Sequence, residues 1–350
     1  MKIIDFRYRP STRASLDSVI KNPVYCEYIK KTDFCSRPEK SLPECIDELR
    51  GLDIAKAVVS GRDIESTYAI QSTNDDVLQC MAAAPDLFIG FWAYDPPKGM
   101  TAVRRFRKAV LEDGIRGAAI DAAMAHCAVD DAKFYPLYAM CCEFDIPVIM
   151  TAGLSPFMPK VVLDSTDPRH IDRVATDFPE LKILLSHGGY PWVLEAIALV
   201  LRHSNVYMDF SPCESKLMGQ NYIQAANEYI TDKVVFASAN PFVEVHKAVE
   251  KYQRLDLTEE CRRKLFYENG MKLLWASAAC RQAYRNHQHQ REHHGHHDVQ
   301  DLSPYRQRMR QLLRKYRRRG RLAERPQDLS GLRSHPGQAG PDGEDRGPAA

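Results

Sequence analysis

The sequence predicts a parallel α/β fold. Short apolar runs with strand character alternate with segments whose apolar residues recur at the helical period. Residues 182–187 show this best, because the run lies between one helical pattern that ends at Phe178 and another that starts at Val193. Such alternation is the repeating unit of a sheet with parallel strands and covering helices.

Eight such units can be counted, which is the number that a (β/α)8 barrel requires. The predicted strands span residues 3–6, 55–60, 87–93, 117–121, 147–151, 183–187, 206–210 and 234–238. The alternative is a doubly wound open sheet, but no Gly-x-Gly-x-x-Gly turn follows any of these strands. We therefore predict a TIM barrel, in which the long segment 10–43 after the first strand covers the mouth.

A change in composition divides the chain near residue 280. Residues 1–280 carry 33 Lys and Arg against 38 Asp and Glu, whereas residues 281–350 carry 15 against 8. Residues 286–297 are rich in histidine, and residues 326–350 are rich in Pro, Gly and charge. We predict a barrel over residues 1–280 and a basic, His-rich, largely disordered tail over residues 281–350, in which residues 303–322 could form a helix.

Several classes of protein are disfavoured by composition. No apolar run approaches the roughly 20 residues of a membrane span, and the first residues lack a signal-peptide pattern, so we expect a cytoplasmic protein. The 10 cysteines form no Cys-x-x-Cys pair, which gives no sign of a thiolate zinc site. We expect a small-molecule substrate and no nucleic acid beyond weak binding through the basic tail, and a homo-oligomer is left open.

Polar side chains gather at the predicted strand ends, which a barrel brings together at one face. In strand order they are Asp5, Arg7 and Arg9, then Arg62, Trp92, Asp121, Thr151, His187, Asp209 and Asn240. The site is predicted to lie among them.

Five segments carry a resemblance to a known family. They are residues 114–117, 134–147, 178–189, 205–209 and 267–269. They resemble the amidohydrolase-related family (amidohydrolase 2) that includes aminocarboxymuconate-semialdehyde decarboxylase, and the resemblance covers about residues 2–276. It implies a metal-dependent hydrolase or carboxy-lyase, with zinc or manganese, on a (β/α)8 barrel.

The metal-ligand positions of that family are substituted in this chain. The family has His-x-His after the first strand, a histidine after the fifth and an aspartate after the eighth. Here the corresponding residues are Arg7 and Arg9, Thr151 and Ala239, and only His187 of the motif histidines is kept. Arginine is a cation without a lone pair to offer a metal. We therefore expect a degenerate metal site and no cofactor, while the resemblance keeps a divalent metal as the alternative.

Arginines in these positions suggest an anion site instead. We expect Arg7 and Arg9, with Arg62, to bind a carboxylate, a phosphate or a developing oxyanion, although salt bridges to nearby aspartates would explain them equally well. The predicted catalytic set is His187 as general acid or base, with Asp5 or Asp209 holding its tautomer. The predicted substrate-binding set is Arg7, Arg9, Arg62, Trp92, Thr151 and Asn240.

The expected function is hydrolysis or decarboxylation of a small carboxylated substrate, with aromatic and thioester compounds as options. The alternative is a non-catalytic barrel that binds a small molecule or serves as a partner subunit. Loss of the metal ligands favours that alternative. The retained His187-Gly188-Gly189 sequence and the charged strand ends favour an enzyme.

Overall fold

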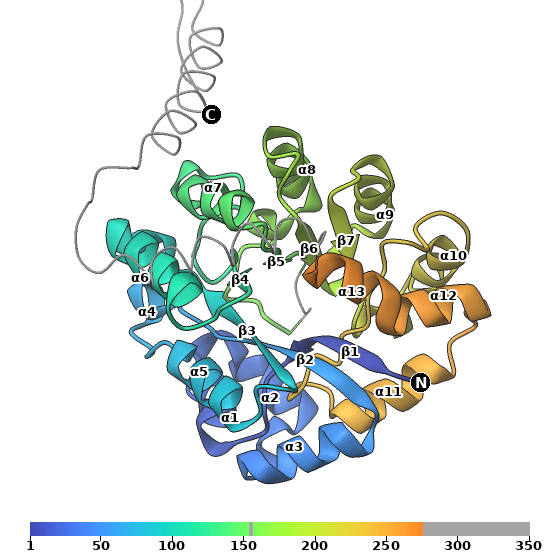
Figure 1. Ribbon diagram of the computed structural model, residues 1–350, viewed down its shortest axis with the longest axis horizontal. Helices are drawn as coiled ribbons and strands as arrows, with labels where there is room; N and C mark the ends of the chain where they lie inside the picture. The colour runs from blue at the N-terminus through green and yellow to red at the C-terminus, as the bar shows by residue number, and fades with distance from the viewer. Residues whose placement is uncertain (154–156, 276–350) are drawn as a thin grey trace, which may run out of the picture. The chain divides into compact units, whose positions relative to one another are not determined.

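In the computed structural model, which describes residues 1–153 and 157–275, a parallel sheet curls at the centre and helices surround it (Figure 1). The strands are β1 (Ile3–Tyr8), β2 (Ile54–Ser60), β3 (Phe88–Ala93), β4 (Gly117–Ile120), β5 (Val148–Thr151), β6 (Ile183–Ser186) and β7 (Val206–Met208). They pair in the order of the sequence, and every pair is parallel. The predicted tail over residues 281–350, with its helix at 303–322, lies outside the described residues.

The helices fall between the strands, as the alternation of patterns predicts. They are α1 (Arg13–Ile20), α2 (Cys26–Thr32), α3 (Leu42–Gly51), α4 (Glu65–Tyr68), α5 (Asn74–Ala83), α6 (Met100–Leu111), α7 (Tyr135–Phe144), α8 (Pro168–Asp177), α9 (Val193–Arg202), α10 (Gln220–Glu228), α11 (Val245–Gln253), α12 (Glu259–Arg263) and α13 (Asn269–Leu274). Each longer helix buries one face; in α8, for example, Ile171, Val174 and Ala175 are buried. In the part of the chain described, no helix is long and apolar enough to cross a membrane.

The eighth predicted strand is present as an extended segment but not as a regular strand. Val234 forms an isolated bridge with Met208 at the end of β7. The backbone groups that follow form hydrogen bonds to both neighbouring strands. The Val235 N–H donates to the Met208 carbonyl of β7, and the Phe236 carbonyl accepts from the Phe6 N–H of β1. Residues 234–238 therefore lie between β7 and β1 and close the ring without forming a full ladder to either.

The interior of the barrel is apolar at mid-height. Nearly every strand contributes at least one inward side chain to a single core cluster. Its members are Ile4, Phe6, Val58, Ile89, Phe91, Ala119, Ile149, Leu184, Val235 and Ala237, with Leu273 of α13. The cluster fills the barrel, so polar chemistry is confined to the strand ends.

A register shift in β1 turns its last residues toward the mouth. Asp5 pairs with Ala57 of β2 and Tyr8 with Val59, so three steps along β1 match two along β2. An extra residue of this kind is a β-bulge, which re-aims the side chains that follow it. As a result Phe6 belongs to the barrel core, and Arg7, its neighbour in sequence, lines the cavity above.

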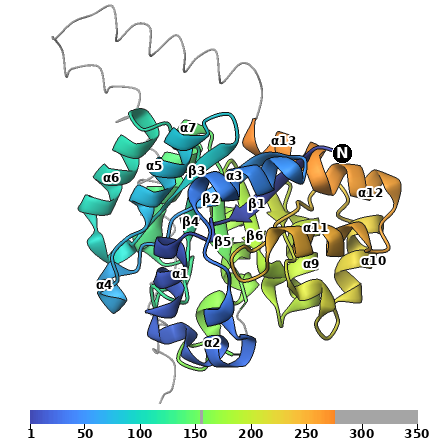
Figure 2. The ribbon, with the colours of Figure 1, turned by 90° about the horizontal axis from the view of Figure 1, so that it is seen from below.

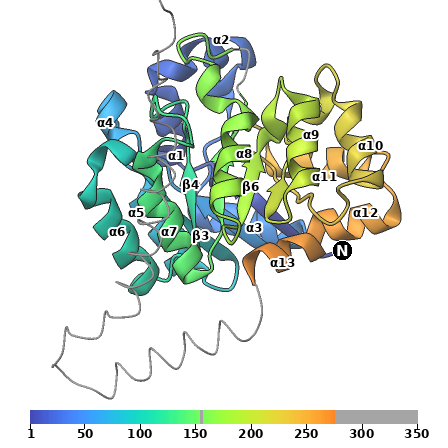
Figure 3. The ribbon, with the colours of Figure 1, turned by 90° about the horizontal axis from the view of Figure 1, so that it is seen from above.

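The segment between β1 and α3 forms a cap, as its length predicts. Figures 2 and 3 show α1 and α2 at the end of the barrel opposite α13 and the N-terminus, which is the end to which the strands point. Leu16, Val19, Val24, Tyr25 and Phe34 of this segment pack against apolar residues of other loops, including Met124 and Met158. The cap is therefore built from a second, smaller apolar cluster.

Replacement of Gly153 by alanine should destabilise the barrel at its mouth. Gly153 has a φ of 76°, and a Cβ there would lie 2.1 Å from the carbonyl oxygen of Tyr190. We expect Gly153→Ala to lower the melting temperature and the free energy of unfolding by more than about 1 kcal/mol. Gly51→Ala is the control, because no atom lies within 4 Å of its Cβ position. Equal melting temperatures for both variants would contradict the described contact.

Candidate active site

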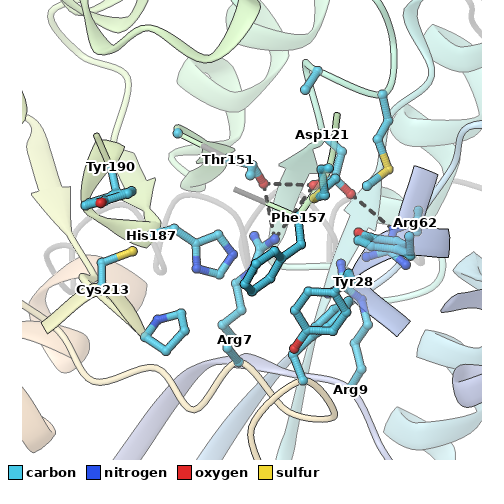
Figure 4. A pocket seen from close by; sticks show the side chains of 18 of the residues that line it. Arg7, Arg9, Tyr28, Arg62, Asp121, Thr151, Phe157, His187, Tyr190 and Cys213 are labelled. Carbon is cyan, nitrogen blue, oxygen red and sulfur yellow. Dashed lines mark hydrogen bonds and ion pairs between the residues drawn. The ribbon is translucent and has the colours of Figure 1, made fainter. Parts of the chain in front are cut away.

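A cavity of about 220 Å³ opens at the strand ends beneath the cap (Figure 4). Its lining residues are Arg7, Arg9, Tyr25, Tyr28, Arg62, Asp121, Ala123, Met124, Thr151, Gly153, Phe157, Met158, His187, Tyr190, Pro212, Cys213, Lys216, Ala239 and Phe242. Pockets for drug-sized ligands are commonly about 300–1,000 Å³. A small ligand therefore fits this space best.

Three guanidinium groups gather on one side of the cavity around a single carboxylate, and we call Arg7, Arg9 and Arg62 the arginine cluster. Arg7 donates to Thr151 Oγ1 at 3.1 Å and lies 3.7 Å from Asp121 Oδ1. Arg62 Nε lies 3.4 Å from Asp121 Oδ2. Thr151 donates to Asp121 at 2.8 Å, so Asp121 is the hub of the group.

Arg9 is a buried cation whose guanidinium group donates to backbone carbonyls. Its Nε donates to the Ser60 carbonyl at 2.9 Å and its Nη2 to the Gly61 carbonyl at 3.3 Å. Within the described ranges, no acidic side chain lies within 4 Å of it. Burial, followed by repulsion from Arg62 and Arg7, lowers the pKa of Arg9 to about 9. Arg9 is therefore still charged at neutral pH, in a place where a charge is costly.

Asp121 remains ionised despite its burial. Burial alone would raise its pKa, but the charges of Arg62, Arg7 and Arg9 outweigh that effect and hold the pKa of Asp121 well below its usual range. One negative charge thus faces three positive ones. In addition, Arg62 Nη1 is buried and has no hydrogen-bond partner among the described residues.

His187 lies beside the arginine cluster, at the turn after β6. It has a φ of 68°, and Gly188 and Gly189 after it also have positive φ. The turn is fixed from two sides, because the Gly188 N–H donates to the Asp209 carbonyl and the Tyr222 hydroxyl donates to the Gly188 carbonyl. A Cβ on Gly188 would lie 2.7 Å from the Tyr222 ring, so a glycine is required there.

The hydrogen bond at Nδ1 fixes the tautomer of His187. This nitrogen faces the Ser211 carbonyl, which can only accept, so Nδ1 carries the proton and Nε2 keeps its lone pair. Burial, followed by the charge of Arg7, lowers the pKa of the imidazole to about 4. His187 is therefore neutral at pH 7, and its free nitrogen suits a base.

Asp5 and Asp209, which were predicted to hold the tautomer of His187, lie beneath the cavity and do not line it. Asp209 Oδ1 accepts from the backbone and hydroxyl of Ser211 and, at 3.3 Å, from the His187 N–H. Asp5 Oδ1 accepts from the N–H groups of Arg7 and Ser238. Both aspartates thus shape the backbone that carries the site, and a carbonyl takes the place expected for a carboxylate at Nδ1. Burial raises the pKa of Asp5 to about 6.

The other predicted residues also divide into those that line the cavity and those that support the backbone around it or lie elsewhere. Thr151 lines the cavity, as do all three arginines and His187. Trp92 and Asn240 are not among the lining residues in the described part of the chain. The Asn240 side chain instead donates to the Arg9 carbonyl and accepts from the Val245 N–H, so it supports the loop that follows residues 234–238.

Sequence reasoning missed the side of the cavity formed after β6 and β7 and most of its apolar wall. The side after β6 and β7 is lined by Tyr190, Cys213 and Lys216. The apolar wall includes Met124, Met158 and Phe242. The cap contributes Tyr25 and Tyr28. The guanidinium carbon of Arg62 lies 5.2 Å from the centre of the Tyr25 ring. No short motif marks these residues. Their only signal is a place in loops that follow predicted strands.

The donors at the strand ends do not fit a divalent metal site of the family type. Such a site needs about three neutral imidazole, carboxylate or thiolate ligands. His187 offers one nitrogen, Asp121 is held by arginines, and burial raises the pKa of Cys213 to about 11, so its thiol keeps its proton. Across residues 1–153 and 157–275, no group of three or more His, Cys, Asp and Glu is arranged to hold an ion.

The charge of Arg7 should be measurable in the titration of His187. We expect NMR to give His187 a pKa of about 4, and Arg7→Met to raise it because a nearby positive charge is removed. The NMR resonance of His187 is assigned as the one that disappears in the His187→Gln variant. The control is Arg13→Met, which removes an exposed arginine that pairs with Asp17. A wild-type pKa near the ordinary 6.5 would show that the imidazole is neither buried nor next to Arg7.

Comparisons with known proteins agree with the predicted fold and family. The profile of the amidohydrolase family matches residues 37–274. A search of curated proteins gave no match. An uncharacterised TIM-barrel protein from Bordetella bronchiseptica is 29% identical over 78% of this chain and 98% of its own, with a TM-score of 0.66.

Two further solved structures share the fold at lower identity. A 2,6-dihydroxybenzoate decarboxylase from Rhizobium is 16% identical, with 78% of this chain and 98% of the other covered and a TM-score of 0.59. A dihydroxybenzoic acid decarboxylase from Polaromonas, with bound manganese and 2-nitroresorcinol, is 18% identical. The match covers 78% of this chain and 96% of the other, with a TM-score of 0.58. The TIM-barrel fold, the resemblance and the preference for an enzyme are thus confirmed. This chain belongs to the amidohydrolase family.

Proposed function

We propose that this protein hydrolyses or decarboxylates a small carboxylated substrate without a metal, with the arginine cluster as the carboxylate site and His187 as the base. The observation that carries the proposal is the charge of the cavity. Three buried arginines lie around a single carboxylate, which among them contacts only Arg7 and Arg62, and Arg62 Nη1 has no hydrogen-bond partner in the described part of the chain. An anion would supply the missing charge and the missing acceptor.

The arrangement suits recognition of a carboxylate better than a structural role alone. A salt bridge to Asp121 accounts for Arg7 and Arg62, but it leaves Arg9 with backbone carbonyls only. Buried charges are normally paired, and guanidinium groups bind carboxylates in a fixed fork. The tyrosines and other apolar side chains of the wall would exclude water and strengthen that pairing.

Of the two reactions, hydrolysis follows more directly from the state of His187. Its Nε2 can take a proton from water while the water oxygen attacks the substrate carbonyl, and the arginines beside it would stabilise the oxyanion. The leaving group then receives the proton from Nε2. Decarboxylation would need a proton delivered to carbon, and a neutral His187 has none on Nε2. Decarboxylases among the solved barrels of the same fold are the reason to test that reaction too.

The substituted ligand positions support chemistry by the chain's own groups. Arg7 supplies a positive charge next to His187, and its charge lowers the pKa of the imidazole. An arginine would thus stabilise negative charge at a position to which the family resemblance assigns a metal ligand. A homo-oligomer, a cytoplasmic location and weak nucleic-acid binding through the tail stay predictions.

A screen of aromatic carboxylates with ester, thioester or ring carboxyl groups tests the reaction. Acid release reports hydrolysis and carbon dioxide release reports decarboxylation. We expect His187→Gln to lower kcat by about 100-fold or more, because general base catalysis contributes about that much. Arg9→Met should raise KM by about tenfold through loss of a charged hydrogen bond.

Arg13→Met is the control for the arginine substitution, because Arg13 is exposed and lies outside the cavity wall. Binding of these carboxylates without any turnover would favour the non-catalytic barrel. Unchanged kinetics in both site variants would refute the proposed roles of His187 and Arg9.

Removal of metal ions gives a separate test. After dialysis against a chelator, we expect the full chain to keep its activity, because the described donors at the strand ends do not make a metal site. The readout is kcat before dialysis, after it and after addition of manganese or zinc. Activity that is lost on dialysis and restored by either ion would refute the metal-free proposal.

A further inference from the structure

We propose that the substrate carries two negatively charged groups, one bound by the arginine cluster and the other by Lys216 on the far side of His187. This inference rests on the proposed function, because it takes the arginine cluster as the first carboxylate site. It adds a second anion subsite and thereby names dianions, such as dicarboxylates, as the substrate class.

Lys216 is a cation in the cavity wall and contacts an aromatic ring there. It follows the short helical turn Cys213–Ser215 after β7, and its side chain lines the cavity. Its Nζ lies 4.7 Å from the centre of the Tyr190 ring, a cation–π contact that stabilises the charge but does not neutralise it. Among the residues that the structure describes, no carboxylate lies within 4 Å of Nζ.

Some other partly buried lysines of this chain are paired with acids, whereas Lys56 and Lys233 donate to backbone carbonyls. Lys98, near the ends of β2 and β3, contacts Asp63 and Glu65. Lys251 contacts Glu214, which is two residues before Lys216 in the sequence. The nearest acid along the chain is therefore already engaged by another lysine, and Lys216 is left to face the cavity.

The two cationic regions lie on either side of His187. In Figure 4, Tyr190 and Cys213 are on one side of the imidazole, and Arg62 and Asp121 are on the other. Lys216 stacks on Tyr190, and its charge contributes to the lowered pKa of His187, after burial and Arg7. A ligand that reaches both regions must pass His187, so its reactive group would lie between its two anionic groups.

The aspartates beneath the cavity do not remove the need for a second anion. Asp5 and Asp209 direct one oxygen each at backbone N–H groups, and within the described ranges neither carboxylate lies within 4 Å of a charged side-chain nitrogen of Arg7, Arg9, Arg62 or Lys216. Asp121 is held on the arginine side. A monocarboxylate at the arginine cluster would leave Lys216 uncompensated beside apolar walls.

Calorimetric titration of benzoate, isophthalate and terephthalate into the full chain tests the second subsite. These probes differ in the number and direction of their carboxylates. We expect at least one dicarboxylate to bind about tenfold tighter than benzoate, because a charged hydrogen bond is added. Lys216→Met should remove most of that gain while benzoate affinity changes by less than about twofold, and Lys216→Arg should keep it.

Lys160→Met is the matched control, because it removes the same charge from an exposed lysine that does not line the cavity. Dicarboxylates that bind no tighter than benzoate, or an equal effect of Lys216→Met on all three probes, would overturn the second subsite while the arginine site stands. Failure of all three probes to bind would overturn the proposed function together with this inference.

Discussion

Closure of the sheet is the constraint on which the site depends. Residues 234–238 bond to Met208 at the end of β7 and to Phe6 in β1, so the first and last strands lie on either side of one segment. In an open sheet β1 and β6 would lie far apart. In the ring, Arg7 from β1 and His187 after β6 line the same cavity, and Arg7 is near enough to lower the pKa of the imidazole.

The electrostatics of the cavity follow from that convergence. Strand ends bring Arg7 of β1 and Arg62, two residues after β2, to Asp121 after β4. The apolar cap buries them, which makes their mutual repulsion costly and any anionic ligand correspondingly favourable. One arrangement therefore accounts for the lowered pKa of Arg9, the ionised Asp121 and the neutral His187.

Membership of the amidohydrolase family informs the fold more firmly than the chemistry. The resemblance assigns metal ligands to four positions at which this chain has Arg7, Arg9, Thr151 and Ala239, and all four residues line the cavity. The same strand ends can thus present fixed cations instead of metal ligands. The uncharacterised Bordetella protein, at 29% identity, is a suitable second subject for the same measurements.

The sequence alone determined the barrel, since hydrophobic periodicity is local and repeats eight times, and it determined that His187, Thr151 and three arginines lie at strand ends. Tertiary structure decided the rest. The bulge in β1 depends on pairing with β2, and it places Arg7 above the core although Phe6 lies within it. Whether Asp5 and Asp209 face the cavity or the backbone, and which carbonyl fixes His187, depends on contacts between distant loops. Lys216 and the individual side chains with which the predicted cap lines the cavity escaped prediction for the same reason, because only the closed ring brings the loops after β1, β6 and β7 to one cavity.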